Sequence, residues 1–133
     1  MTKGFLLLTG LMAGMTSFII SPGSSSSENT RNGSDIYIQY CQSCHMVNGE
    51  GVEGLYPPLA KTNYVKNTKK IIDIILNGQF GEVKVNNKKY NTDMPAQAYL
   101  SDEQIADVLT YVRSSWGNKY PAITPAQVKE QRK

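Results

Sequence analysis

The chain has 133 residues and a formal net charge of +3, with 40% hydrophobic and 19% charged residues. The excess of positive charge is slight and the basic residues do not alternate with aromatic ones, which argues against a nucleic-acid partner. The length allows one domain of about a hundred residues after an N-terminal leader and excludes two.

The N-terminus has the pattern of an export signal. Lys3 is the one charged residue before residues 4–20, an uncharged and mostly apolar stretch, which is typical of a secretory signal peptide. Ser21 and Gly23 offer small residues for cleavage, without forming Ala-x-Ala. We therefore predict that residues 1–23 are either a secretory signal peptide or an uncleaved N-terminal anchor. Both place the protein in the periplasm, or otherwise outside the cytoplasmic membrane.

The remainder of the chain divides by composition. Residues 24–32 are polar and rich in serine, without apolar periodicity, and predict a linker. We predict one domain at residues 33–118 and a C-terminal extension at residues 119–133. With an uncleaved anchor, the linker would tether this domain to a membrane.

The first half of the domain predicts two helices and a hairpin. A short helix with Ser34 as its N-cap runs into the sequence CQSCH, and a loop rich in glycine and proline follows at residues 48–62. The sequence NTKKIIDIILN predicts an amphipathic helix that ends at Gly78. Alternating residues around Asn86 and Asn87 predict a small β-hairpin.

The second half gives the strongest helical pattern. In LSDEQIADVLTYVRSSWGN, Ser101 and Gln104 predict a capping box at the start, and Gly117 predicts the end. A last short helix is predicted with Thr124 as its cap and Pro125 as its first residue. The fold class is therefore mainly α, with short helices, long loops and one small hairpin.

The chain places its two cysteines directly before its one histidine. Cys41 and Cys44 are three positions apart, and His45 follows. A structural zinc site needs four ligands, and only three residues cluster here. A redox dithiol usually lies at the start of a helix after a strand, whereas this pair lies near the end of a predicted helix.

Covalent haem attachment uses all three residues. Cys41 and Cys44 can each form a thioether bond with the haem edge, and His45 can then coordinate the iron. The attachment takes place outside the cytoplasm, in agreement with the export signal. We predict one covalently bound haem c per chain.

A second axial ligand follows by elimination. The chain has no second histidine, and three of its five methionines lie in the export segment. Met46 adjoins His45 and cannot reach the other face of the haem. Met94 remains, in a loop where Pro95 disfavours helix. We therefore predict that His45 and Met94 bind the iron, which leaves one-electron exchange as the chemistry of the site.

These residues resemble the family of class I (single-haem) bacterial c-type cytochromes. The resemblance rests on CQSCH, GEGVEGLYPPLA, YNTDMPA and LSDEQIADVLTYVRSSWGN, and covers about residues 33–118. It implies a small cytochrome c fold, in which short helices and loops wrap around one covalent haem.

The resemblance also implies roles in the haem pocket. The carbonyl of Pro57 would accept a hydrogen bond from the second nitrogen of His45 and so fix the ring, and Leu59 would pack on the haem. Apolar residues are expected around the haem as an apolar shell: Leu55, Leu59, Ile71, Ile75 and Leu109.

A helix crossing is implied as well. Gly33, Tyr37 and Cys41 recur every fourth residue on the first predicted helix. In the family, this face packs across the C-terminal helix, where Val108 and Tyr111 would be the facing pair.

Two features depart from the smallest members of the family: the C-terminal extension, and the hairpin before Met94. They resemble cytochromes that serve as subunits or domains of larger redox enzymes. We predict a free electron carrier or an electron-transfer subunit, with a redox protein as donor and another as acceptor, such as a membrane oxidase, dehydrogenase or reductase. The seven lysines in residues 61–89 would steer an acidic partner.

Two alternatives stay open at the level of sequence. A haem enzyme or gas-binding protein would need an open iron position, and a thiol-disulfide oxidoreductase would carry no haem.

Overall fold

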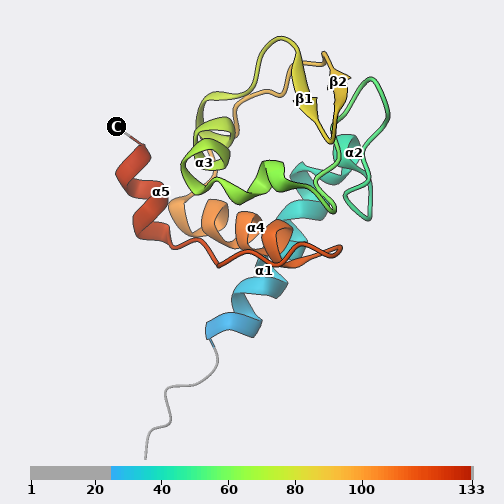
Figure 1. The fold of residues 1–133 in the computed structure, drawn as a ribbon. Coiled ribbons are helices and arrows are strands. Elements are labelled where there is room, and N and C mark those ends of the chain that lie inside the picture. The colour runs from blue at the N-terminus through green and yellow to red at the C-terminus, as the bar shows by residue number, and fades with distance from the viewer. Residues whose placement is uncertain (1–24, 133) are drawn as a thin grey trace, which may run out of the picture.

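The structure, a computed structural model, describes residues 25–132, with side chains described from Asn32 onward. In this part of the chain, five α-helices, one 3-10 helix and a two-stranded antiparallel sheet follow one another (Figure 1). The elements are α1 (Ser25–Tyr40), α2 (Gln42–His45), η1 (Asn63–Lys66), α3 (Thr68–Asn77), β1 (Val83–Val85), β2 (Lys88–Tyr90), α4 (Asp102–Ser114) and α5 (Pro125–Gln131). The predicted mainly α-helical class with one hairpin is confirmed.

Helix α1 begins earlier than predicted. We expected a linker up to residue 32 and a helix capped at Ser34, whereas α1 already begins at Ser25. Packing against α4 holds Gly33 in the helix, and once a helix is nucleated each further residue extends it at little cost. The predicted export segment, residues 1–23, lies outside the described residues. None of the helices in residues 25–132 is long and apolar enough to cross a membrane.

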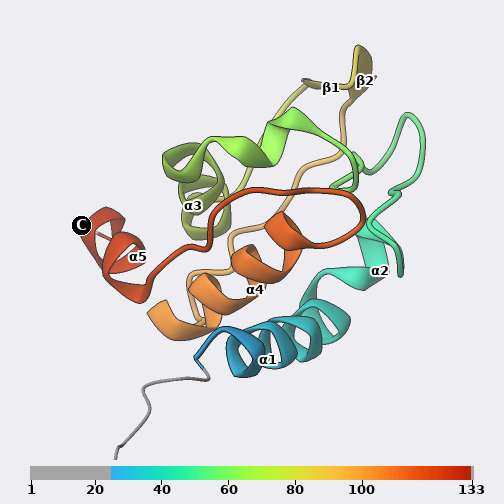
Figure 2. The same ribbon diagram turned by 60° about the horizontal axis from the view of Figure 1, so that its bottom comes forward.

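Helices α1 and α4 pack side by side (Figure 2), and they approach each other closely at Gly33. A Cβ atom added at Gly33 would lie 2.2 Å from the carbonyl oxygen of Asp107 and 2.8 Å from the Cβ of Tyr111. Tyr37 is buried, with its ring 5.6 Å from that of Tyr111 and 4.9 Å from that of Trp116. The implied crossing is present, and Trp116 adds a third ring that the sequence did not indicate.

Local signals determine α3 and the hairpin. The Oδ1 of Asn67 accepts a hydrogen bond from the Lys70 amide at 3.1 Å, and Gly78, with φ of 83°, ends the helix. Asn86 and Asn87 have φ of 48° and 65°, which is the left-handed backbone of a type I′ hairpin turn. Both predictions are confirmed.

The end of α4 differs from the prediction. The helix ends at Ser114, before Gly117. The Nδ2 of Asn118 donates to the carbonyl of Val112 at 2.8 Å and thereby satisfies one of the last carbonyls of the helix. The chain can therefore leave the helix before it reaches the glycine.

The C-terminal segment is part of the hydrophobic core. Val128 of α5 is fully buried and Ile123 is 4% exposed. Both belong to one cluster with apolar residues of α1, α3 and α4, and α5 lies beside α3 and α4 in both views (Figures 1 and 2). The core therefore continues beyond the predicted domain end at residue 118.

Candidate cofactor site

The two cysteines and the histidine lie at the junction of α1 and α2. The amide of Cys41 donates to the carbonyl of Tyr37, and the amide of His45 donates to the carbonyl of Cys41, both at 2.9 Å. The backbone hydrogen bonds therefore stay helical through the motif. Cys41 and Cys44 are free and half-buried, and they line the same cavity as His45.

His45 is buried and held in one orientation. It is 6% exposed, and its Nδ1 lies 2.9 Å from the carbonyl oxygen of Pro57. Because a carbonyl only accepts, Nδ1 carries the proton and Nε2 keeps its lone pair. Burial lowers the pKa of His45, and the hydrogen bond to Pro57 only partly opposes this. The ring therefore stays neutral near pH 7, which is the form that binds metals.

A glycine closes the loop that brings Pro57 to His45. The amide of Gly51 donates to the carbonyl of His45 at 3.0 Å, and the amide of Val52 donates to that of Tyr56 at 2.8 Å. Gly51 has φ of 65°, and a Cβ atom there would lie 2.3 Å from the carbonyl oxygen of Tyr56. The sequence marked this glycine only as a loop residue, and its role at the histidine was missed.

The two leucines of this loop differ in position. Leu59 lines the cavity and packs against the core, and its amide donates to the carbonyl of Gly49 at 2.8 Å. Leu55, which we expected in the apolar shell, is 53% exposed and does not line the cavity. The bridge between Val52 and Tyr56 closes a tight turn that leaves Leu55 at its exposed tip. The prediction for Leu55 is wrong.

Met94 lines the same cavity from the loop between β2 and α4. Its amide donates to the carbonyl of Gln79 at 2.8 Å, and the amide of Gln79 donates to the carbonyl of Met94 at 2.9 Å. Gly78 makes this approach sterically feasible, because a Cβ atom there would lie 2.7 Å from the carbonyl oxygen of Met94. The end of α3 therefore fixes the backbone position of Met94.

The cavity is apolar, and its empty space, mouth included, is about 1000 Å³. Its aliphatic walls include Ile71, Ile74, Ile75, Val83, Val108 and Leu109. Two cysteines, a histidine with a neutral ring and one methionine on an apolar cavity fit a covalently bound haem: the cysteines would attach it, and the histidine and the methionine would bind its iron.

The other two chemistries of the cysteine pair fit less well. Burial raises the pKa of the Cys41 thiol to about 11, and the neighbouring Cys44 adds to the rise. A redox dithiol instead needs a thiol whose pKa is lowered, because the thiolate is the nucleophile. Among residues 25–132, no three side chains of His, Cys, Asp or Glu gather closely enough to hold a metal ion, whereas structural zinc takes four ligands.

Two buried polar side chains next to the cavity were missed by sequence reasoning. Arg113 is 3% exposed and donates to the carbonyls of Val65 at 2.9 Å and Pro121 at 2.8 Å. Asn118 donates to the carbonyl of Leu59 at 2.8 Å, which links the end of α4 to the cavity loop. Arg113 and Asn118 both come after the last apolar residue of the α4 stripe. Composition alone does not indicate which polar side chains in this stretch are buried.

Comparisons with known proteins agree with this geometry. The family model for cytochrome c matches residues 30–116, a range that includes the cysteine pair, His45 and Met94. Cytochrome c-552 of Thermus thermophilus is 36% identical over 109 residues, which cover 77% of this chain and 82% of that protein.

Cytochrome subunits of dehydrogenases are also similar. The cytochrome c subunit of the quinone alcohol dehydrogenase of Gluconacetobacter polyoxogenes is 37% identical over 105 residues, 75% of this chain and 22% of that subunit. The cytochrome c subunit of gluconate 2-dehydrogenase of Pantoea cypripedii is 30% identical over 105 residues, 75% of this chain and 23% of that subunit. The chain thus spans most of the Thermus protein and less than a quarter of these subunits.

Proposed function

The chain belongs to the cytochrome c family and carries electrons rather than acting as an enzyme itself, and we propose that it transfers them singly through a haem bound covalently to Cys41 and Cys44. One observation carries this proposal. Cys41, Cys44, His45 with its neutral ring, and Met94 line one apolar cavity.

We assign the iron to His45 and Met94. The carbonyl of Pro57 holds the Nδ1 proton of His45 and so directs Nε2 as the ligand. The pairing with Gln79 holds the backbone of Met94 at the cavity. Haem iron with these two axial ligands supplies one-electron exchange between Fe(III) and Fe(II). With both His45 and Met94 on the iron, no position would be left open for a gas or a peroxide.

The apolar walls contribute to the same function. Ile71, Ile75 and Leu109 are buried and line the cavity, and Leu59 covers it from the loop side. Apolar surroundings disfavour additional charge. These side chains therefore exclude water and favour the less charged, reduced state of the site.

We propose that the protein works in the periplasm, or otherwise outside the cytoplasmic membrane. The support is the leader at residues 1–23, with Lys3 before an uncharged apolar stretch. Cleavage of this leader yields a free domain, and an uncleaved leader tethers the domain to the membrane.

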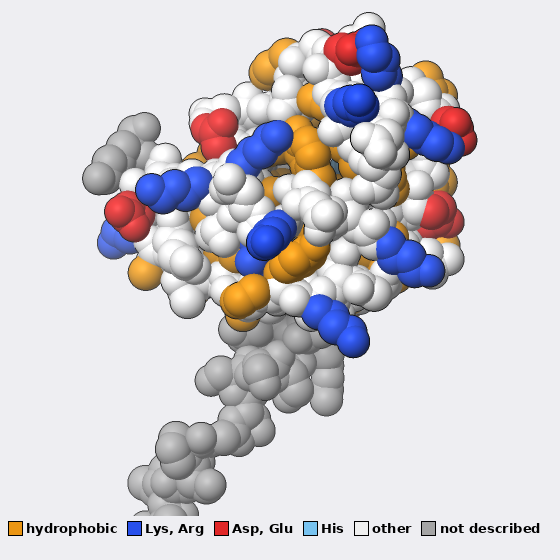
Figure 3. Space-filling view, in the orientation of Figure 1, with side chains coloured by type: hydrophobic (Ala, Val, Ile, Leu, Met, Phe, Trp, Pro, Cys, Tyr) orange, Lys and Arg blue, Asp and Glu red, His pale blue; other side chains and the backbone are white. Residues whose placement is uncertain are grey.

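Redox proteins are the proposed partners, with the chain as a free carrier or as the electron-transfer subunit of a larger enzyme. Similarity to cytochrome subunits of dehydrogenases supports a dehydrogenase as donor. The seven lysines of residues 61–89 are all exposed, and Figure 3 shows basic side chains spread over one face with apolar side chains between them. An acidic partner would be steered to such a surface, more strongly at low salt.

The test uses the full chain produced in a host that attaches haem to c-type cytochromes. We expect a coloured protein whose intact mass exceeds that of the polypeptide by one haem, with both thiols unavailable to alkylation. The mass also reports whether the leader is cleaved. A colourless protein with two reactive thiols would contradict the proposal.

Replacement of the second ligand tests the assignment of the iron. Met94→Ala should lower the midpoint potential, because thioether ligation favours the reduced state, and should allow carbon monoxide to bind to the reduced protein. Met46→Ala is the matched control, since Met46 adjoins His45, and should leave the potential unchanged. A Met94→Ala protein with the wild-type potential in a redox titration would remove Met94 from the site.

A further inference from the structure

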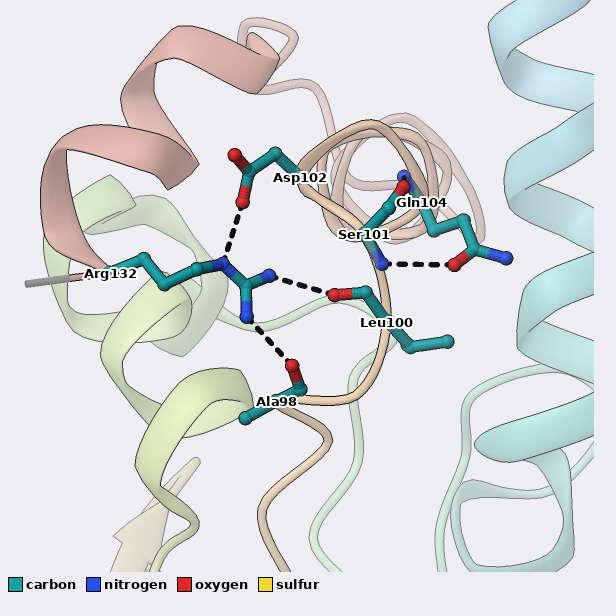
Figure 4. Close-up of polar contacts among 6 residues, drawn as sticks. All are labelled: Ala98, Leu100, Ser101, Asp102, Gln104 and Arg132. Atoms are coloured by element: carbon teal, nitrogen blue, oxygen red, sulfur yellow. Dashed lines mark hydrogen bonds and ion pairs between the residues drawn. The ribbon is translucent and has the colours of Figure 1, made fainter.

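The loop between Met94 and α4 is held at several points. At its start, Met94 pairs with Gln79, and further along the amide of Gln97 donates to the carbonyl of Ile75 at 2.7 Å. Both contacts attach the loop to α3 or to the residues that follow it. At its far end, the loop is contacted by Arg132, the residue that follows α5 near the C-terminus of the chain (Figure 4).

Arg132 donates three hydrogen bonds to this end of the loop (Figure 4). Nη1 donates to the carbonyl of Ala98, Nη2 to the carbonyl of Leu100, and Nε to Oδ1 of Asp102, each at 2.7 Å. The side chains of Arg132 and Asp102 are 32% and 22% exposed, so water screens the contacts only in part. Hydrogen bonds from a cation are stronger than neutral ones.

Helix α5 places Arg132 firmly. The backbone amide of Arg132 donates to the carbonyl of Val128 at 3.1 Å, and the side chain of Val128 is fully buried in the core. The Nε2 of Gln131 donates to the carbonyl of Lys69 in α3 at 2.9 Å. The end of α5, which carries Arg132, is therefore attached to α3, the same helix that holds the Met94 loop at Gln97.

We propose that Arg132 is a positioning residue for Met94: by binding Ala98, Leu100 and Asp102, it keeps residues 95–101 folded against α3 and the thioether on the cavity. This inference rests on the proposed function, since it takes Met94 as an iron ligand. The guanidinium suits these contacts because it donates from three separate nitrogens in one rigid plane, whereas a lysine ammonium has its three donors on a single nitrogen at the end of a flexible stem.

Competition by added imidazole measures how firmly the loop is held. In the haem-loaded, oxidised full chain, Arg132→Gln should raise the apparent affinity for imidazole about tenfold, equivalent to about 1.4 kcal/mol. Arg132→Lys should raise it by a smaller factor. Lys129→Gln removes the same charge from an exposed position of α5 and should leave the affinity unchanged. Equal affinities for Arg132→Gln and Lys129→Gln would overturn the proposal.

Amide hydrogen exchange separates the loop from the whole fold. In Arg132→Gln, the amides of Gln97 and Leu100 should exchange faster, while that of Val108 in α4 keeps its rate. Unchanged exchange rates at Gln97 and Leu100 would show that the hydrogen bonds of Arg132 do not hold the loop. Faster exchange together with an unchanged imidazole affinity would overturn the link to Met94.

Two further comparisons keep the outcome decisive. If Arg132→Gln does not fold, Asp102→Ala removes one of the three contacts and should raise the imidazole affinity by a smaller factor; no rise would overturn the proposal. If Met94→Ala binds imidazole no more tightly than the wild type, the proposed ligation by Met94 is wrong. If Met94→Ala binds imidazole more tightly than the wild type and Arg132→Gln does not, the proposed role of Arg132 is wrong, whereas the ligation by Met94 is not contradicted.

Discussion

At Gly33 the absence of a side chain decides how closely α1 and α4 approach each other. A Cβ atom there would lie 2.2 Å from the carbonyl oxygen of Asp107, well inside the distance at which atoms repel. The same helix leads directly to Cys41, so the approach at Gly33 also determines where the first thiol meets the cavity. A residue without chemistry of its own thus contributes to the geometry of the site.

Gly33→Ala should lower the free energy of unfolding by about 1–3 kcal/mol, because an overpacked contact forces the two backbones apart. This loss should exceed the gain of about 1 kcal/mol or less from the higher helix propensity of alanine. Denaturant unfolding of the haem-loaded protein measures it. Gln39→Ala, at an exposed position of the same helix, is the control and should change stability little. A Gly33→Ala protein as stable as this control would contradict the close approach.

Among the elements, α4 and α5 begin with the same local arrangement. The Oγ of Ser101 accepts from the amide of Gln104 at 3.2 Å, and the Oε1 of Gln104 accepts from the amide of Ser101 at 2.9 Å. Thr124 and Gln127 form the equivalent capping box at α5. Because the partners are three positions apart in sequence, both starts could be predicted without the tertiary structure.

Ser101→Ala should cost about 1 kcal/mol of stability, since it leaves the Gln104 amide without its capping oxygen. Ser114→Ala makes the same chemical change at the other end of the helix, where the hydroxyl donates to the carbonyl of Thr110 on an exposed surface. That control should change stability by less than about 0.5 kcal/mol. Thermal unfolding of both variants decides the matter, and equal losses would argue against the capping box.

In the whole molecule, the cofactor cavity and the hydrophobic core share their walls. Val108, Leu109 and Val112 of α4 line the cavity and belong to the core cluster. The same cluster includes Ile123 and Val128 from the C-terminal segment. A substitution in the C-terminal segment is therefore expected to lower the stability of the whole domain, because the domain unfolds as one cooperative unit.

Val128→Ala should lower the free energy of unfolding by about 2 kcal/mol, through the lost burial of two methyl groups and the cavity that they leave. Val47→Ala is the matched control: Val47 is 59% exposed, and its truncation should cost less than about 0.5 kcal/mol. Both are measured by denaturant unfolding. Equal stabilities would show that α5 is not part of the core.

Sequence reasoning was accurate where one short segment holds the whole signal. The turn at Asn86 and Asn87, the end of α3 at Gly78 and the capping box at Ser101 each depend on residues within a few positions of one another. It was wrong about the start of α1, the end of α4 and the exposure of Leu55. These three features depend on contacts with other segments or on the exact backbone conformation of a turn. A local sequence pattern does not show the energies of such contacts.

The sequence by itself determined the fold class and the chemistry proposed for the site, because the chain has so few cysteine, histidine and methionine residues. Cys41, Cys44 and His45 are its only cysteines and histidine, and among the methionines outside the leader, elimination left Met94. The family resemblance already implied the hydrogen bond between His45 and the Pro57 carbonyl, whereas only the tertiary structure decided that Gly51 closes the loop that makes it and that Arg132 reaches the loop of Met94. Such contacts join distant segments, and the burial that brings them together is a property of the whole core.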